Sequence, residues 1–362
     1  MDTDQLQTEL NKFLGYLSQD ENNLHLLYRV IDLQTQLAQF DNAEQQIKSA
    51  IQRLGADPGL LFRLATFSIA SGDYKQAIAT LLDMQRQGVD NDVLRYNLGY
   101  AYLYTGEYEQ AEEVLRAIDL QSQQVPNVAV VLARAQHHLN KLDEAQSNLE
   151  KYLVRHPQDV TALGQLAIIS LDAQQQDRAL EYATTALELD ADSLEAHVVL
   201  GTISFDRSDL NHAKQYYHHA LKRDAKNARS LSGLGMIALQ QQDFSSACDY
   251  LQQATNLMPN DTANLVALAW AQIASNQISV AKSNLQQALI LDGQSAETLA
   301  SLALVALFEG NDNQASEVLL KAEAMQPNSP LVLLCKTILA AGDNLDTPEK
   351  IIQSVISFFE KA

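Results

Sequence analysis

The chain has 362 residues, with 45 acidic against 25 basic side chains and a formal charge of −20. This negative charge argues against nucleic-acid binding, because contacts to phosphates require basic grooves. The two cysteines, Cys248 and Cys335, lie far apart and provide neither a CxxC zinc motif nor a disulfide framework. The acidic, polar N-terminus does not read as a signal peptide, and no run approaches the ~18 apolar residues of a membrane span. We therefore expect a cytoplasmic protein without membrane insertion.

The first 23 residues are expected to form one helix over residues 4–17. Apolar residues recur there at helical spacing and would form its buried side. They are Leu6, Leu10, Phe13, Leu14 and Leu17. Because this helix looks like the second half of a missing hairpin, we interpret residues 1–23 as a cap on the apolar face of the next hairpin.

A period of 34 residues governs the chain from residue 24 onward. One position of the period is alanine nine times: Ala43, Ala77, Ala111, Ala145, Ala179, Ala213, Ala247, Ala281 and Ala315. Twelve residues earlier stands a second small or apolar residue: Ile31, Ala65, Gly99, Ala133, Ala167, Gly201, Gly235, Ala269 and Ala303. Small residues at both positions let two helices of a hairpin approach closely. Pro157, Pro259 and Pro327 share one phase just past the second helix, where proline can end a helix.

This pattern resembles the tetratricopeptide repeat (TPR) family, whose signature combines a leucine–glycine step, a tyrosine, a central alanine and a late proline. Residues 97–126 carry it most fully, with Leu98, Gly99, Tyr102 and Ala111 in place. The resemblance covers roughly residues 24–341. It implies an all-α, right-handed superhelical solenoid of helix-turn-helix repeats, in which each repeat contacts only its neighbours.

Nine repeats are expected over residues 24–329, followed by a degenerate tenth repeat and a C-terminal capping helix over residues 330–362. The nine hairpins should begin near Leu24, Pro58, Asp92, Pro126, Val160, Leu194, Ala228, Thr262 and Ala296. Thr347, Pro348 and Glu349 open the last helix with an N-cap, a first-turn proline and an acid. That helix is apolar on more than one side. It would either cap the ninth repeat or use Ile351 and Phe358 as a homodimer or partner contact.

The resemblance also implies that the first helix of each hairpin lines a concave groove, which predicts the partner-binding residues. In repeats one to four they are Tyr28, Arg29, Phe62, Arg63, Tyr96, Asn97, Tyr100, Tyr104, Arg134 and His137. Tyrosine and arginine concentrate binding energy at interfaces, and arginine pairs with carboxylates. This set favours a peptide or amphipathic helix with apolar anchors and an acidic group. Alternatively, the tyrosines fill spaces between hairpins and the arginines pair with local acids.

The later half of the groove is largely apolar. Phe205, Met236 and Trp270 would face inward and form a second, greasier groove for an amphipathic helix. The alternative is that superhelical closure buries them.

No catalytic or cofactor-binding pattern is recognisable. The adjacent pairs His137-His138 and His218-His219 point to different sides of a helix and cannot easily share a metal ion. There is no glycine-rich phosphate loop and no GxSxG motif. We therefore expect no cofactor and no enzymatic activity.

The sequence thus predicts a non-enzymatic scaffold or adaptor, of the style of bacterial TPR proteins, that binds a segment of another protein in its groove. The alternative is a structural scaffold that oligomerises through its C-terminal helix and end faces.

Overall fold

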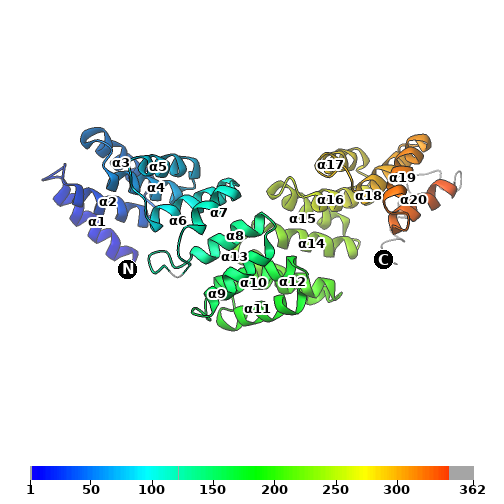
Figure 1. Ribbon diagram of the computed structural model, residues 1–362. Coiled ribbons are helices and arrows are strands. Elements are labelled where there is room, and N and C mark those ends of the chain that lie inside the picture. The colour runs from blue at the N-terminus through cyan, green and yellow to red at the C-terminus, as the bar shows by residue number, and fades with distance from the viewer. Residues whose placement is uncertain (1, 121, 342–362) are drawn as a thin grey trace. The chain divides into compact units, whose positions relative to one another are not determined.

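The computed structural model of the protein describes residues 2–120 and 122–341. These residues form α-helices joined by short turns, with no strand among them, as Figure 1 shows. They divide into two compact units, one within residues 1–175 and one within residues 176–362. The predicted all-α repeat architecture is confirmed.

Within each unit, successive helices pack as antiparallel pairs. The first unit contains α1 (Thr3–Leu17), α2 (Leu24–Gln36), α3 (Phe40–Leu54), α4 (Pro58–Ser71), α5 (Tyr74–Arg86), α6 (Asp92–Thr105), α7 (Tyr108–Arg116), α8 (Val128–His138), α9 (Leu142–Leu153) and α10 (Val160–Asp172). The second contains α11 (Gln176–Leu189), α12 (Leu194–Asp206), α13 (Leu210–Arg223), α14 (Ala228–Gln240), α15 (Phe244–Leu257), α16 (Thr262–Ala274), α17 (Ile278–Leu291), α18 (Ala296–Phe308), α19 (Asp312–Met325) and α20 (Pro330–Ala341).

Small residues at fixed phase allow these helices to pack closely. All nine alanines of the 34-residue series are buried. A Cβ atom built on Gly99 of α6 would lie 2.4 Å from Cγ of Leu115 on α7, and one on Gly235 would lie 2.5 Å from Cγ of Leu251. The large side chain of the second helix therefore occupies the space that glycine leaves on the first.

The turn inside each hairpin repeats with the same 34-residue period. One residue adopts a positive φ in every hairpin: Ala38, Gly72, Gly106, Asn140, Gln174, Ser208, Gln242, Asn276 and Gly310. The next residue precedes the second helix, and in eight of the nine turns its N–H bonds back to a carbonyl five residues earlier, as from Gln39 to Gln34. This is the αL arrangement with which many helices end.

Ala38 is the turn residue least suited to this backbone. Its φ is +54° and its side chain is exposed, so an L-residue is strained there and no packing depends on the methyl group. We expect Ala38→Gly to stabilise the first hairpin by about 0.5–1 kcal/mol. Ala70→Gly, at an exposed helical position of α4, should destabilise by about 1 kcal/mol. Urea unfolding of both variants measures whether their stabilities change in opposite directions. Destabilisation by Ala38→Gly would contradict the backbone strain inferred at Ala38.

The second helix of the third hairpin is shorter than its period predicts. Leu115 and Ile118 are spaced as on one side of a helix, but α7 ends at Arg116, between them. Ile118 nevertheless remains buried in the irregular segment that follows, and Val125 is buried with it. Two apolar anchors in the connection thus replace the missing helical turn against the core around Leu98 and Leu132.

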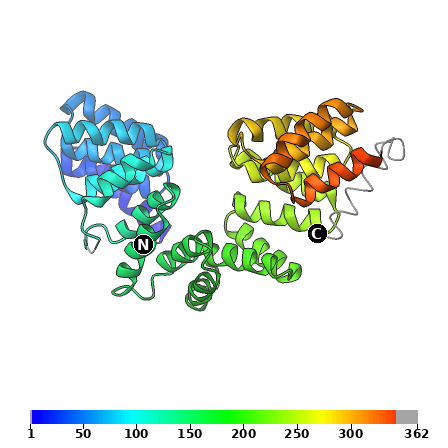
Figure 2. The same cartoon turned by 45° about the vertical axis from the view of Figure 1, so that its right-hand side comes forward.

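The two ends of the described chain pack on their neighbouring hairpins. Leu10 and Leu17 of α1 are buried against α2, with Leu6, Phe13 and Leu14 partly buried beside them. At the other end α20 contacts α18 and α19 (Figure 2). Ile351 and Phe358 lie outside the described residues, so the expected last helix and its dimer contact stay predictions.

Candidate partner-binding surfaces

In each unit the first helices of successive hairpins contact one another. These are α2, α4, α6, α8 and α10 in the first unit, and α12, α14, α16 and α18 in the second. We call the side that they form the first-helix face of that unit. The predicted partner-binding residues of the described chain all lie on these helices.

A row of tyrosines follows α6 on the first-helix face of the first unit. Ring centroids are 6.2 Å apart between Tyr96 and Tyr100 and 4.7 Å apart between Tyr100 and Tyr104. Tyr74, the first residue of α5, stacks on Tyr104 at 4.9 Å. Tyr104, between Tyr100 and Tyr74, is 48% exposed. We call these four residues the tyrosine row.

Burial raises the pKa of three tyrosines in the row. It is the main cause that raises the pKa of Tyr100, followed by a hydrogen bond with Tyr104. Burial also raises the pKa of Tyr74 and Tyr96. These phenols are therefore neutral at physiological pH and offer hydroxyl groups beside apolar ring faces, a combination that suits interfaces.

The arginines of repeats one and two are engaged within the protein. Arg29 pairs with Glu9 of α1 at 2.7 Å. Arg63 pairs with Asp32 at 2.8 Å, and its guanidinium lies 4.0 Å from the ring centroid of Tyr28. Both arginines therefore join neighbouring helices, which is the local pairing with acids that the sequence left open as an alternative.

Tyr28 links two hairpins through its hydroxyl group. It donates a hydrogen bond to Asp57, which also accepts from the backbone N–H groups of Gly59 and Leu60 and so caps α4. The bond from Tyr28 is the main cause that lowers the pKa of Asp57. Burial and this bond raise the pKa of Tyr28 to about 12. Tyr28 is thus placed as a structural contact.

Arg134 of α8 is a cation of a different kind. Its Nε donates to Gln165 at 3.3 Å, and no carboxylate pairs with it within the described ranges. His137, one turn along, pairs with Asp172 at 2.7 Å. Arg134 also lies close enough to Tyr96 to lower its pKa, against the larger effect of burial. Arg134 therefore lies beside the tyrosine row, on the same face.

Two further predicted residues flank this area. Phe62 of α4 is half-buried against the core that includes Leu61 and Leu98. Asn97 is half-buried on α6 beside Tyr96. Sequence reasoning missed Tyr74, although aromatic residues start the second helix at Phe40, Tyr74, Tyr108 and Phe244, a recurrence in phase with the period.

The second unit holds a pocket of about 680 Å³ on its first-helix face. Four helices or their N-terminal caps contribute to it, namely α14, α16, α18 and α20. Met236, Leu239, Val266, Trp270 and Leu331 form its apolar lining. Met236 is 37% exposed and Trp270 only 5%. Met236 and Trp270, which we expected to face the groove, both line this pocket. Trp270, however, is mostly covered by neighbouring side chains.

Phe205 does not line this pocket. It is half-buried against the cluster around Ala213 and Tyr217, between α12 and α13. The structure therefore places it as a packing residue of the sixth hairpin.

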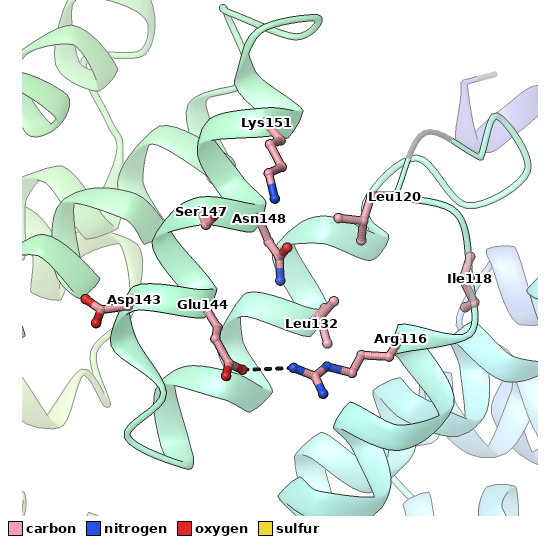
Figure 3. Close-up of a pocket in the computed structure, with 9 residues that line it drawn as sticks. All are labelled: Arg116, Ile118, Leu120, Leu132, Asp143, Glu144, Ser147, Asn148 and Lys151. Atoms are coloured by element: carbon pink, nitrogen blue, oxygen red, sulfur yellow. Dashed lines mark hydrogen bonds and ion pairs between the residues drawn. The ribbon is translucent and has the colours of Figure 1, made fainter.

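A smaller hollow of about 400 Å³ opens between α7 and α9, beside Leu132 of α8 (Figure 3). Ile118 and Leu120, in the segment that follows α7, contribute to its lining. Arg116, its most prominent cation, already pairs with Glu144 at 2.9 Å, the dashed contact in Figure 3, and with Glu112 at 3.2 Å. Arg116 is thus already engaged by two carboxylates.

Metal sites and membrane spans are both absent from residues 2–120 and 122–341. No group of three or more His, Cys, Asp or Glu side chains there is arranged to hold a metal ion. No helix in those residues has the length and apolar character needed to cross a bilayer.

Comparisons with solved structures show the same architecture in other proteins. The Cut9–Hcn1 hetero-tetramer of the APC/C is similar with a TM-score of 0.64 and 17% identity, covering 94% of this chain and 66% of that chain. A structure of Pseudomonas aeruginosa pilF is similar with a TM-score of 0.50 and 18% identity, covering 59% of this chain and 97% of that chain. At these identities the likeness shows the fold alone. No curated protein matches the sequence.

The family comparison agrees with the 34-residue period. The family described as tetratricopeptide repeat matches residues 62–129, 96–160, 130–196 and 198–261, together more than half of the chain. Such repeats generally form non-enzymatic scaffolds for protein–protein interaction. The chain belongs to the tetratricopeptide repeat family.

Proposed function

We propose that this protein is a non-enzymatic adaptor that binds a segment of another protein on the first-helix face of its first unit. The segment lays apolar side chains on the tyrosine row and places a carboxylate at Arg134. The observation that carries the proposal is the row of adjacent tyrosine rings, in which Tyr74 stacks on the 48% exposed Tyr104.

The chemistry of the row supports this role. Stacked aromatic side chains lose little conformational freedom on binding and contribute large contact areas, so tyrosine is frequent among residues that dominate interface energy. A core residue would be covered by its own chain, whereas the ring of Tyr104 is half exposed. The row thus has the properties of a preformed contact surface.

The ion pairs already present in the protein determine where an acidic group of the partner can bind. Arg29 and Arg63 already hold Glu9 and Asp32, so a partner carboxylate would have to compete with ion pairs that are in place. Among the residues that the structure describes, Arg134 has only the amide oxygen of Gln165 as its hydrogen-bond acceptor. An incoming carboxylate there gains a charge-assisted bond without breaking an ion pair.

The proposal divides the chain by role. Residues 1–23 cap the first repeat, residues 24–329 are nine repeats, and residues 330–362 are a degenerate tenth repeat with a capping helix. The Cut9–Hcn1 structure is a hetero-tetramer. That supports only the general idea that such a solenoid holds a partner.

A pull-down from the source organism, with three variants, tests the proposal. Tyr104→Ala and Arg134→Gln should each lose the same partner by at least tenfold, because hot-spot truncations cost about 2 kcal/mol or more. Tyr16→Ala, which removes a tyrosine of similar exposure (46%) from α1, should retain it. Retention of the partner by both Tyr104→Ala and Arg134→Gln, or its loss in all three variants, would refute the assignment of this face.

A further inference from the structure

The helix α13 is basic in a chain that is otherwise strongly acidic. Residues 207–229 hold six of the 25 lysines and arginines of the chain but only two of its 45 acidic residues. Lys214, Lys222 and Arg223 belong to α13 itself, which contains no acidic residue. We propose that the exposed side of α13 docks an acidic helix of a partner protein. Because α13 is a second helix, this surface is separate from the first-helix face, and the inference stands or falls independently of the proposed function.

The cations of α13 follow one another at a spacing that a partner helix can match. Lys214, His218 and Lys222 are each four residues apart, so they lie on one side of α13. We call these three residues the basic stripe. Its two lysines are exposed, and a separation of eight residues corresponds to roughly 12 Å along the helix axis. A helix with carboxylates at the same spacing would meet both lysines at once.

The side chains of the basic stripe are close enough to influence one another. Burial lowers the pKa of the His218 imidazole, and the charges of Lys214 and Lys222 lower it further. The imidazole is therefore neutral at pH 7 and lies near both ammonium groups. A carboxylate placed on the stripe would meet two cations and a ring N–H that can donate a hydrogen bond.

The cations of α13 are not engaged by internal ion pairs. No carboxylate pairs with Lys214, Lys222 or Arg223 among the residues that the structure describes. Lys214 is close enough to Asp243 to lower the pKa of that carboxyl, but the hydrogen bonds that Asp243 accepts from Ser246 as the N-cap of α15 contribute more. A partner carboxylate would therefore gain contacts on α13 without displacing an internal ion pair.

The repeat itself does not require this charge. The same three positions of the neighbouring second helices are uncharged or acidic: Leu180, Thr184 and Glu188 in α11, and Cys248, Gln252 and Asn256 in α15. Lys222 and Arg223 lie in the last turn, where cations complement the helix dipole, but α11 and α15 have no basic residue there. Lys214 lies in the first half of α13, where the dipole gives a cation no advantage. The basic stripe is thus a property of the sixth hairpin.

The negative charge of the rest of the chain favours an acidic protein segment over a larger polyanion. A nucleic acid or an anionic membrane extends its charge well beyond one helix, and the formal charge of −20 would repel it there. Asp177, Glu181 and Glu188 are already exposed on the preceding second helix, α11. A single acidic helix needs no surface larger than α13, whose 14 residues extend over roughly 21 Å.

A synthetic acidic helix tests the proposal. The probe is a fluorescein-labelled, alanine-based helical peptide with glutamate at every fourth position, and a second peptide has glutamine in place of each glutamate. Binding of each peptide to the full-length protein is measured by fluorescence anisotropy. We expect the glutamate peptide to bind and the glutamine peptide not to bind. The affinity of the glutamate peptide should fall as salt is raised, because salt screens exposed charges.

Two double variants with the same net charge separate the basic stripe from a general effect of charge. Lys214→Gln/Lys222→Gln should weaken the glutamate peptide about fivefold, the combined effect of two exposed ion pairs. Lys48→Gln/Lys321→Gln is the control, because these exposed lysines lie on α3 and α19 and pair with acids of their own helices. It should leave the affinity unchanged. Both variants should keep the wild-type melting temperature, since all four side chains are exposed.

Several results would overturn the proposal. They are no binding of the glutamate peptide, equal binding by wild type and Lys214→Gln/Lys222→Gln, or equal loss in the two double variants. Tighter binding of a single-stranded DNA oligonucleotide through the same lysines would identify a nucleic acid as the ligand. Self-association without peptide, abolished by Lys214→Gln/Lys222→Gln, would identify a second copy of the chain as the occupant. Loss of the glutamate peptide in Arg134→Gln alone would place it on the first unit.

Discussion

Gly233→Ala is expected to destabilise the second unit, although alanine favours helices more than glycine does. The ring of Tyr217 lies between α12 and α14, and a Cβ atom on Gly233 would come within 2.3 Å of two of its carbons. On the opposite side a Cβ on Gly201 would lie 2.7 Å from the same ring. The ring is buried and its hydroxyl bonds to Thr202, so it cannot move away from an added Cβ atom.

Overpacking of this kind costs about 1–3 kcal/mol, which exceeds or cancels the ~1 kcal/mol that alanine gains in a helix. Gly15→Ala supplies the matched control, because Gly15 lies within α1 and a Cβ atom added there would meet no other atom within 4 Å. We expect Gly15→Ala to be stabilising and Gly233→Ala to be destabilising. Amide hydrogen exchange localises each change to its hairpins, since each repeat contacts only its neighbours.

A double-mutant cycle identifies the cause. Tyr217→Leu removes the ring and should make the additional cost of Gly233→Ala small, giving a non-additive pair. If Gly233→Ala raised the melting temperature as Gly15→Ala does, the close approach of Tyr217 would be wrong.

Asp57→Ala is expected to destabilise the first unit by about 2 kcal/mol. It removes the N-cap of α4, which is worth roughly 0.5–2 kcal/mol, and it leaves the Tyr28 hydroxyl without its acceptor. Asp57→Asn retains the capping oxygen but not the charge, so we expect it to lose less. Urea unfolding of the two variants compares them directly; equal loss would show that the cap geometry contributes nothing.

The hydrogen bond between Tyr28 and Asp57 predicts that the stability of the first unit depends on pH in both acidic and alkaline solution. The pKa of Asp57 is lowered, chiefly by the bond from Tyr28, so its contribution is complete above its unfolded value of about 4 and falls as pH drops through the lower folded value. The pKa of Tyr28 is raised to about 12, so its contribution is complete below about 10 and falls as pH rises toward 12. The difference in stability between wild type and Tyr28→Phe should therefore be constant between these limits and shrink outside them.

The period predicted the helices because its signal repeats. Eight first helices begin at the residues expected from the 34-residue spacing, and the alanine series is buried throughout. A position that must be small in every hairpin carries a small residue in every copy of the repeat. The early end of α7 at Arg116 occurs in one repeat, so no recurring residue marks it in the sequence.

The sites were harder to predict because they depend on pairs of side chains. Helical phase placed Arg63 and Arg134 on one face, but only the rotamers of neighbouring helices show that Asp32 engages the first while Gln165 is the partner of the second. Similarly, a sequence does not reveal that the Nδ2 of Asn264 lacks an acceptor. Trp270 had the expected phase, yet neighbouring side chains cover most of it.

The most direct test of the central claim is site-specific photocrosslinking from the tyrosine row. A photoreactive phenylalanine derivative replaces Tyr104, and in a second variant replaces Gln110, an exposed residue of α7 outside the row. We predict that the position-104 variant crosslinks one partner protein in the source cells and that Arg134→Gln reduces the yield, whereas the position-110 variant does not capture it. Equal crosslinking from both positions, or none from position 104, would contradict the proposal that this face binds the partner.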